Sequence, residues 1–338
     1  MKEGRHKLDI PIFFSFDNNY VEPAAVAIFS LLNSAKRVNN YNLFVLHSNI
    51  EPKKQNLLKN IVNNFKNAQI TFINTYGFLD KYFYECNFRK CFAKSKFTPD
   101  ALVKCFASSF FPNLDKIIYS DVDVIFVSDI SNLYFQDMQD NYFYGVKSVF
   151  MKWEKNELSH LSKKNFDALK DSYIAGGIFI ANLKQIRKDK IEEKMMKIIE
   201  DKAIEKKWPD QDVINLACQG KIGFIPLNYI SYPYLIDYLN IKDFNSHYSN
   251  NELFDSIINP KIIHFAAEKP WNGSPNYSNL WWTIFNYLNL QITPIFSNKK
   301  YIKDKESYLK YKKYKSLYKI ILIILGIFII KDIFYISI

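Results

Sequence analysis

Glycine is scarce in this chain of 338 residues, which contains nine, and glycine-rich nucleotide motifs are missing. Neither G-x-G-x-x-G nor G-x-x-x-x-G-K-[ST] occurs anywhere in the sequence. A dinucleotide-binding fingerprint and a P-loop are therefore both excluded as explanations of the fold.

Cysteine is equally sparse, and its spacing gives no structural framework. No C-x-x-C pair and no zinc-ligand spacing connects the four residues, Cys86, Cys91, Cys105 and Cys218. We expect free thiols in the reducing cytoplasm. We also expect no secretory signal peptide, because Asp9 and Pro11 interrupt the apolar stretch that follows the basic N-terminus.

Positive charge is concentrated near the C-terminus. The net charge is +11, and residues 299–319 hold nine Lys against Asp304 and Glu306. That local +7 leaves +4 for the rest of the chain. Charge confined to a tail beside an apolar run indicates anionic lipid, and we expect no nucleic-acid partner.

The same tail carries tyrosines at helical spacing and then eleven consecutive apolar residues, 320–330. A spanning helix needs about 20 apolar residues, and Lys331 and Asp332 interrupt the run. We therefore expect residues 299–338 to contact an anionic membrane surface through a basic aromatic helix and a shallow anchor. A tail helix that packs on the domain, or on a second copy, is the alternative.

The first half of the chain alternates short apolar runs with amphipathic segments. We expect strands at 10–16, 42–46 and 69–73, with helices beginning near Pro23 and covering 52–65. This alternation predicts an α/β fold with a mostly parallel sheet, whose ligands bind at the carboxyl ends of the strands.

Later in the first half, a helix is expected to start at Thr98-Pro99-Asp100, and a continuous strand at 116–127. The second half is more mixed. Further along we expect a strand at 175–183, a helix at 184–202, a short helix at 210–219 opened by Asp210, and an apolar run at 261–265. We place one domain at residues 1–296 and the membrane-associating tail at 297–338.

Asp121 and Asp123 lie within the strongly β-prone run. Strand alternation would put both carboxylates on one face, where they repel each other and are costly to bury. A divalent cation resolves both problems, and hard oxygen ligands favour Mg²⁺ or Mn²⁺. The alternative is a solvated polar turn.

His264 lies in an apolar run and is followed closely by Lys269-Pro270-Trp271. A neutral imidazole can complete a metal site, and a nearby Lys can neutralise a diphosphate. The alternatives are a hydrogen-bonded core histidine and an ordinary surface amine.

These residues belong to segments that resemble glycosyltransferase family 8 over about residues 10–275. The family comprises retaining enzymes of the lipopolysaccharide galactosyl- and glucosyltransferase type, related to glycogenin. The matching segments are Phe14–Tyr20, the helix after Thr98, Ser120–Asp123, Ala175–Leu183, Asp210–Asp212 and His264–Trp271. The resemblance implies a GT-A-like, Rossmann-related mixed sheet with flanking helices.

The resemblance also implies a role for individual residues. Asp121, Asp123 and His264 would hold Mn²⁺ or Mg²⁺, and Asp210 and Gln211 would approach the reacting carbon of the sugar. Contacts to the donor would come from Ser15, Asp17, Asn19, Tyr20, Lys104, Asp121 and Lys269. Lys104 stands where the family usually has Arg.

The implied activity is transfer of a hexose, glucose or galactose, from a UDP-sugar to a saccharide acceptor. The acceptor would be lipid-linked lipopolysaccharide or lipooligosaccharide core, at the cytoplasmic face of the membrane. Family resemblance implies retention of the anomeric configuration. No well-placed carboxylate nucleophile is evident, so we hypothesise a same-face displacement in which the leaving phosphate oxygen takes the proton.

Two departures from the family pattern support an alternative function. Ala175 replaces an Asn that contacts the donor sugar, and Ala267 stands near the family's Gly, with the His-to-Lys spacing one residue shorter. They support a catalytically inactive, membrane-associated sugar-nucleotide-binding protein. A sugar nucleotidyltransferase is a further alternative. It would normally have a glycine-rich loop where this chain has Asp-Asn-Asn-Tyr at residues 17–20, which argues against it.

Overall fold

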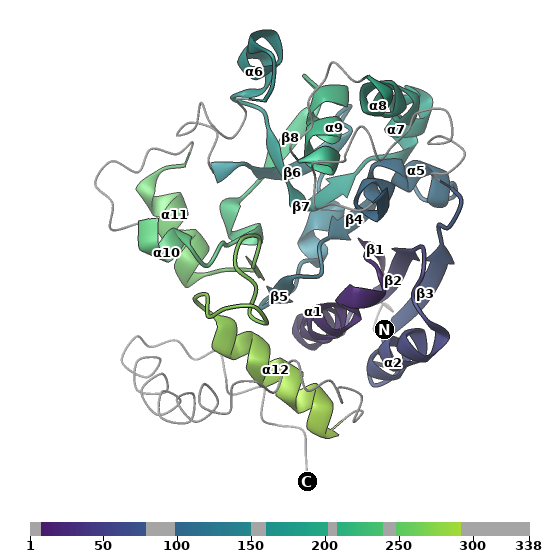
Figure 1. Ribbon diagram of the computed structural model, residues 1–338, viewed down its shortest axis with the longest axis vertical. Helices are drawn as coiled ribbons and strands as arrows, with labels where there is room; N and C mark the ends of the chain where they lie inside the picture. Colours follow the sequence, from purple (N-terminus) through teal and green to yellow (C-terminus); the bar gives the residue numbers. More distant parts are fainter. Residues whose placement is uncertain (1–7, 79–98, 150–159, 202–207, 239–247, 292–338) are drawn as a thin grey trace, which may run out of the picture. The chain divides into compact units, whose positions relative to one another are not determined.

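The computed structural model describes residues 8–78, 99–149, 160–201, 208–238 and 248–291, all of which belong to one compact unit, Met1–Thr293 (Figure 1). Residues 292–338 lie outside the described residues, so the expected membrane contact of the tail and the domain boundary at 296 stay predictions. Among the helices described, none is both long and apolar enough to cross a membrane.

A seven-stranded sheet forms the centre of the unit, in the order β3-β2-β1-β4-β7-β6-β8. Its strands are β1 (Asp9–Ser15), β2 (Asn40–His47), β3 (Ala68–Asn74), β4 (Ile117–Ser120), β6 (Phe143–Lys147), β7 (Ile174–Ala181) and β8 (Ile222–Ile225). β7 is antiparallel to the other six strands of this sheet, since it pairs antiparallel with both β4 and β6. The predicted mixed, mostly parallel sheet is confirmed.

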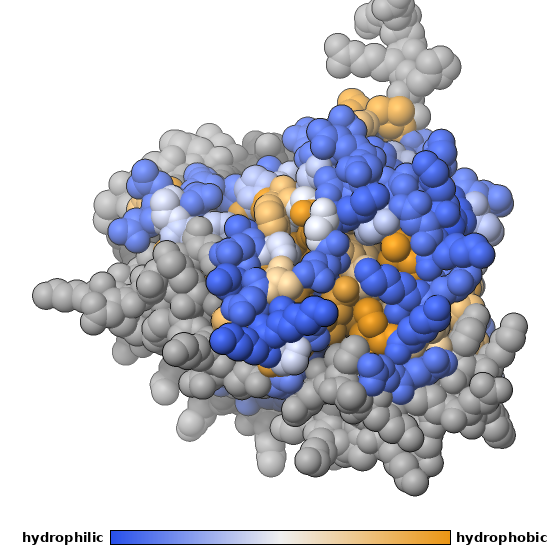
Figure 2. All heavy atoms as spheres, turned by 90° about the horizontal axis from the view of Figure 1, so that it is seen from above, coloured by the Kyte–Doolittle hydropathy of each residue, from blue (hydrophilic) through white to orange (hydrophobic). Residues whose placement is uncertain are grey.

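Helices cover both faces of this sheet (Figure 1). The helices α1 (Val21–Ser34) and α2 (Pro52–Val62) lie on one side, and α5 (Ala107–Phe110), α7 (Leu183–Lys188), α8 (Ile191–Glu200) and α9 (Pro209–Ala217) lie on the other. Burial on both faces explains why β1 reads as an unbroken apolar run rather than an alternating one. From above, mostly hydrophilic side chains surround a smaller apolar area (Figure 2).

The predicted continuous strand at 116–127 is wrong. β4 ends at Ser120, and β5 (Val124–Phe126) belongs to a separate two-stranded sheet with β9 (Ile262–His264). The chain leaves the main sheet at residues 121–123. Two like charges one residue apart, Asp121 and Asp123, are costly to keep in a strand that is buried on both faces.

Two helix predictions also need correction. The helix predicted at 184–202 is divided into α7 and α8, because Lys190 adopts a left-handed conformation with φ 53°. The helix expected from Thr98 is a 3₁₀ helix, η2 (Pro99–Phe106), that continues into the short α5; Thr98 itself lies outside the described residues.

Seven further elements complete the described part of the unit. They are η1 (Asn18–Tyr20), η3 (Ser131–Phe135), α6 (Lys163–Leu169), η5 (Leu227–Tyr229), α10 (Leu235–Tyr238), α11 (Asn250–Ile258) and α12 (Ser278–Gln291). Of these, η1 follows β1 directly, at the same edge of the sheet as the carboxyl end of β4, because the two strands are parallel.

An aromatic cluster supports the carboxyl end of β4 from within the core. Phe13 of β1 lies 4.9 Å from Tyr119 of β4 between ring centroids, and Phe179 of β7 stacks on Tyr119 at 4.8 Å. All three rings are almost fully buried. The position of Tyr119 is therefore fixed by close packing and not by a surface contact.

Replacing Phe13 with Ala should lower the free energy of unfolding by about 3–5 kcal/mol, because it leaves a cavity under Tyr119. Phe135→Ala is the matched control: its ring is 51% exposed, and the change should cost less than about 0.5 kcal/mol. Urea unfolding followed by circular dichroism measures both, and similar losses for the two variants would contradict this view of the core.

Candidate active site

Backbone pairing brings two distant parts of the chain together at the carboxyl end of β4. The amide of Asp121, just after β4, donates to the carbonyl of Gly177 at 2.9 Å. β9 pairs antiparallel with β5, with His264 opposite Val124, and the amide of Phe265 donates to the carbonyl of Asp123 at 3.0 Å. The three predicted metal ligands, Asp121, Asp123 and His264, therefore meet.

Each of these three residues directs one ligand atom toward the other two, and the three atoms lie within 4.8 Å of one another. Oδ2 of Asp121 lies 3.5 Å from Nε2 of His264, and Oδ1 of Asp123 lies 3.1 Å from the same nitrogen. The other oxygens are engaged elsewhere, since Oδ1 of Asp121 accepts from Tyr119 and Lys104, and Oδ2 of Asp123 accepts from Lys269.

This donor set fits a divalent cation. Oδ1 of Asp123 is buried and makes no well-aligned hydrogen bond within the described part of the chain. A buried carboxylate oxygen without a partner is costly, and a cation would satisfy it. Two carboxylate oxygens and one imidazole nitrogen suit Mn²⁺ or Mg²⁺, and three protein ligands leave positions open for a substrate.

Asp123 keeps its charge in this environment. Burial alone would raise the pKa of its carboxyl group, but the nearby His264 and Lys269 outweigh burial and hold the pKa well below its usual range. The side chain is therefore an anionic ligand at neutral pH.

Lys104 is buried at the centre of the site. Its ammonium lies 2.6 Å from Oδ2 of Asp210, 3.2 Å from Oδ1 of Asp121 and 3.2 Å from the carbonyl of Gly176. The ring of Tyr119 lies below it, with the nitrogen 4.5 Å from the ring centroid. Burial alone would lower the pKa of Lys104, but Asp121 and Asp210 raise it well above its usual range.

Asp210 and Gln211 reach the same place from the first turn of α9, which begins at Pro209. Oε1 of Gln211 accepts from the amide of Gly176 at 2.8 Å, at the start of β7. The reversed direction of β7 matters here, because its amino end lies beside the carboxyl end of β4. Both predicted catalytic residues thus lie next to the metal ligands.

Two glycines allow this close approach. A Cβ on Gly177 would lie 2.5 Å from Cε1 of His264, and one on Gly176 would lie 3.1 Å from Oδ2 of Asp210. Any side chain at position 177 would therefore displace the imidazole, while position 176 is tight against the carboxylate of Asp210.

The residues predicted to contact the nucleoside follow β1. Asp17 accepts a hydrogen bond from the amide of Asn19 at 2.8 Å and caps η1. Tyr20 is 38% exposed and meets Trp271 edge-on, with centroids 6.2 Å apart. Burial raises the pKa of the Tyr20 hydroxyl. Ser15, half-buried, ends β1 at the same edge of the sheet.

Lys269 lies in the loop after β9, and its ammonium contacts the metal ligand Asp123. It donates to Asp123, to the carbonyl of Phe265 at 2.6 Å and to that of Ala266 at 3.2 Å. Its side chain is 18% exposed, against 7% for Lys104. Of the two departures from the family pattern, Ala175 is buried at the start of β7, whereas Ala267 is exposed.

The sequence analysis missed two supports of the site. Tyr119 lies two residues before Asp121, and strand periodicity could have identified it as a neighbour on the same face. Asp212, fully buried in α9, accepts from Tyr173 at 2.6 Å, from His160 at 2.9 Å and from the amide of Trp208 at 2.9 Å. No local pattern connects those donors.

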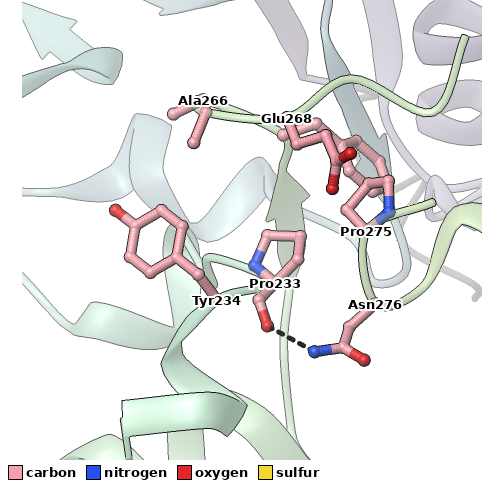
Figure 3. A pocket seen from close by; sticks show the side chains of 8 residues that line it. Pro233, Tyr234, Ala266, Glu268, Pro275 and Asn276 are labelled. Carbon is pink, nitrogen blue, oxygen red and sulfur yellow. Dashed lines mark hydrogen bonds between the residues drawn. The ribbon is translucent and has the colours of Figure 1, made fainter. Parts of the chain in front are cut away.

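A recess is formed in part by the residues that follow His264 in the chain (Figure 3). It is lined by Pro233, Tyr234, Phe265, Ala266, Ala267, Glu268, Pro275 and Asn276. The side-chain amide of Asn276 donates to the carbonyl of Pro233 at 3.1 Å and joins the two walls. The Glu268 carboxylate lies at its edge (Figure 3).

Known proteins share this fold. The chain is 22% identical to WbbM, a bifunctional glycosyltransferase, with a TM-score of 0.68, over 83% of this chain and 50% of that one. It is 18% identical to the galactosyltransferase LgtC, crystallised with donor and acceptor sugar analogues, with a TM-score of 0.61, over 82% of this chain and 95% of that one. These likenesses show the fold.

Sequence comparison shows the family. A lipopolysaccharide 1,2-glucosyltransferase of Escherichia coli is 24% identical over 306 residues, which cover 89% of this chain and 84% of that protein. The model of the family described as "Glycosyl transferase family 8" matches residues 11–274, which include all the predicted metal-binding, catalytic and donor-contact residues. The chain belongs to glycosyltransferase family 8.

Proposed function

We propose that this glycosyltransferase moves a hexose, glucose or galactose, from a UDP-sugar to a saccharide acceptor, with Mn²⁺ or Mg²⁺ held by Asp121, Asp123 and His264. The observation that carries the proposal is the convergence of three ligand atoms, two carboxylate oxygens and one imidazole nitrogen, in the same site as Asp210 and Gln211. Oδ1 of Asp123 is buried beside Nε2 of His264 without a well-aligned hydrogen bond, and a cation between the two atoms would satisfy it.

The donor would lie along the edge of the sheet between η1 and the metal ligands. Tyr20 offers a flat ring to the uracil, with Ser15, Asp17 and Asn19 beside it. Lys269 is partly exposed and held by loop carbonyls, and it would neutralise the diphosphate. The bound cation would supply charge neutralisation for the same leaving group.

The chemistry we propose retains the anomeric configuration. The bond between the anomeric carbon and the β-phosphate oxygen of UDP breaks, and the acceptor oxygen forms its bond on the same face. The acceptor's proton passes to the departing phosphate oxygen. Asp210 is already paired with Lys104 at 2.6 Å, which makes it a poor nucleophile. Isolation of a glycosyl adduct on Asp210 or Gln211 would contradict this route.

The acceptor we propose is lipid-linked lipopolysaccharide or lipooligosaccharide core. The name of the Escherichia coli relative supports this class. The recess beside His264 offers such an acceptor an approach to the donor sugar. The basic and apolar residues 299–338 would bring the enzyme to the cytoplasmic face of the membrane, where this acceptor is found.

The first prediction concerns the metal. UDP release from one UDP-hexose in a panel should require Mn²⁺ or Mg²⁺, disappear with EDTA, and fall by about 100-fold or more in Asp123→Ala. Asp115→Ala is the matched control, since its side chain is 73% exposed. No release from any donor, even with a crude lipid-linked sugar extract, would favour an inactive sugar-nucleotide-binding protein.

The second prediction compares two glycine variants, one that disturbs the metal ligand His264 and one that disturbs Asp210. Gly177→Ala should weaken Mn²⁺ binding by about tenfold or more, because its methyl group would displace the His264 imidazole. Gly176→Ala presses on Asp210 instead and should leave Mn²⁺ affinity within about threefold of wild type. Titration calorimetry with Mn²⁺ measures both, and equal affinities for the two variants would argue against His264 as a ligand.

The third prediction concerns the tail. Changing Lys312, Lys313 and Lys315 to Gln in the full chain should weaken binding to vesicles rich in phosphatidylglycerol by about 100-fold, since each Lys contributes about 1 kcal/mol. Co-sedimentation at low salt measures this. The wild-type chain should also lose binding as salt rises, and unchanged binding in the triple variant would exclude electrostatic attachment through this segment.

A further inference from the structure

The start of β7 leaves the regular strand ladder where the site begins. Gly145 of β6 pairs with Phe179, whereas Lys147 pairs with Ile174, so two steps along β6 correspond to five steps along β7. Such an irregularity takes backbone groups of the longer side out of the ladder, and buried backbone groups need a partner. The start of β7 therefore depends on hydrogen bonds from outside this ladder.

Helix α9 supplies these bonds through two side-chain amides. Oδ1 of Asn215 accepts from the amide of Ile174 at 2.8 Å, and Nδ2 of Asn215 donates to the carbonyl of the same residue at 2.9 Å. Oε1 of Gln211 accepts from the amide of Gly176 at 2.8 Å. Residues four apart lie on one face of a helix, so successive turns of α9 hold the strand at two points.

Asn215 also ties the strand to the turn of α9 that carries Gln211. Its Nδ2 donates to the carbonyl of Gln211 at 2.8 Å, one turn earlier in the helix. The residue is fully buried. A side-chain amide has one acceptor oxygen and two N–H donors, and both kinds of group are used here. A shift of α9 against β7 would leave buried polar groups unpaired, so these bonds specify one arrangement of the two elements.

The apolar contacts of α9 do not give the same precision. Val213, Ile214 and Ala217 are buried, but apolar burial is not directional and tolerates a small slide or rotation of the helix. The first turn of α9 lies close to the strand, since a Cβ on Gly176 would be 3.5 Å from Cβ of Gln211. The amide of Asn215 therefore decides how the first turn of α9 lies at this contact.

We propose that Asn215 is a positioning residue for sugar transfer, which holds the first turn of α9, with Asp210 and Gln211, against the start of β7. The inference rests on the proposed function, which places Gln211 at the reacting carbon of the sugar. Asn215 acts through Gln211 and has no part in binding the metal or the nucleoside, because the residues proposed for those contacts lie on other elements.

The test uses the full chain and compares Asn215→Ala, Gln211→Ala and the double variant. Asn215→Asp keeps the size and the acceptor oxygen but loses the N–H donors, and it replaces Asn215→Ala if that variant does not fold. Asn182→Ala is the matched control, because it removes an amide that donates to the carbonyl of Asn141 at 3.2 Å, just beyond the opposite end of β7. Calorimetry gives the affinity for UDP with Mn²⁺, and steady-state kinetics give kcat and KM for the UDP-hexose.

We expect kcat to fall about 30-fold or more in Asn215→Ala, because Gln211 is displaced, while the affinity for UDP stays within about threefold of wild type. The double variant should have a kcat within about threefold of that of Gln211→Ala, since both changes disturb one unit. Asn215→Asp should lose about tenfold or more in kcat, again with UDP affinity retained. Asn182→Ala should keep kcat within about threefold of wild type.

Two results would overturn the proposal. One is a multiplicative loss of kcat in the double variant, which would make Asn215 and Gln211 independent. The other is an equal loss of kcat in Asn182→Ala and Asn215→Ala, which would mean that any lost amide contact of β7 loosens the sheet and that Asn215 has no special relation to the site.

Hydrogen exchange without metal or donor separates the inference from the proposed function. The amide of Gly176 donates to Gln211, and the amide of Asn182, just beyond the other end of β7, donates to the carbonyl of Tyr142 at 2.8 Å. In Asn215→Ala the exchange rate at Gly176 relative to that at Asn182 should rise about tenfold or more. If wild type neither binds UDP nor transfers a sugar, the proposed function fails, while this ratio still decides whether Asn215 holds Gln211. An unchanged ratio would refute the inference.

Discussion

Repulsion between two carboxylates is the constraint from which the rest of the site follows. Asp121 and Asp123 are separated by one residue and are largely withdrawn from water. Such a pair is stable only if each charge is compensated. The chain does this asymmetrically, since one oxygen of each carboxylate meets an ammonium, from Lys104 or Lys269, and the other faces His264. The lysines thus orient the carboxylates, and the two remaining oxygens and His264 form a set of three donors that could hold a metal ion.

Sheet topology decides which residues can provide that compensation. Parallel strands β1 and β4 end at the same edge, which places η1 near the aspartates. β7 enters the sheet at that edge because it runs in the opposite direction, so Gly176 and Gly177 lie against the end of β4. The amino end of α9 is tied to β7 through Gln211. The small β5–β9 sheet then adds His264. A fully parallel sheet would have placed the amino end of β7 at the far edge.

Much of this could be predicted from local sequence. Strands β1 to β3 and helices α1 and α2 follow from apolar runs and turn signals, and the confirmed mixed sheet follows from their alternation. The convergence of Asp121, Asp123 and His264 was also predicted, but the stated reason for the first two was wrong: they share a site because the chain bends, not because a strand alternates.

Other features depend on contacts that no local pattern contains. The break at Lys190 requires a left-handed residue in a sequence with helical periodicity throughout. The burial of Asp212 depends on donors from residues 160, 173 and 208. Lys104 has three oxygen acceptors from distant segments of the chain, Asp121, Asp210 and Gly176, and no local pattern connects them.

The charges of the site would also set the order in which a cation and a diphosphate bind. Asp121, Asp123 and Asp210 contribute −3, and Lys104 and Lys269 contribute +2, so these five contacting side chains sum to −1. A diphosphate approaching this sum would be repelled. A divalent cation changes the sum to +1, which attracts a diphosphate, and the low exposure of the site strengthens both effects. Each of the two lysines has three oxygen acceptors, and the side chain of Lys269 is the more exposed of the two, at 18% against 7%. The electrostatics would therefore favour the cation first and the nucleotide second.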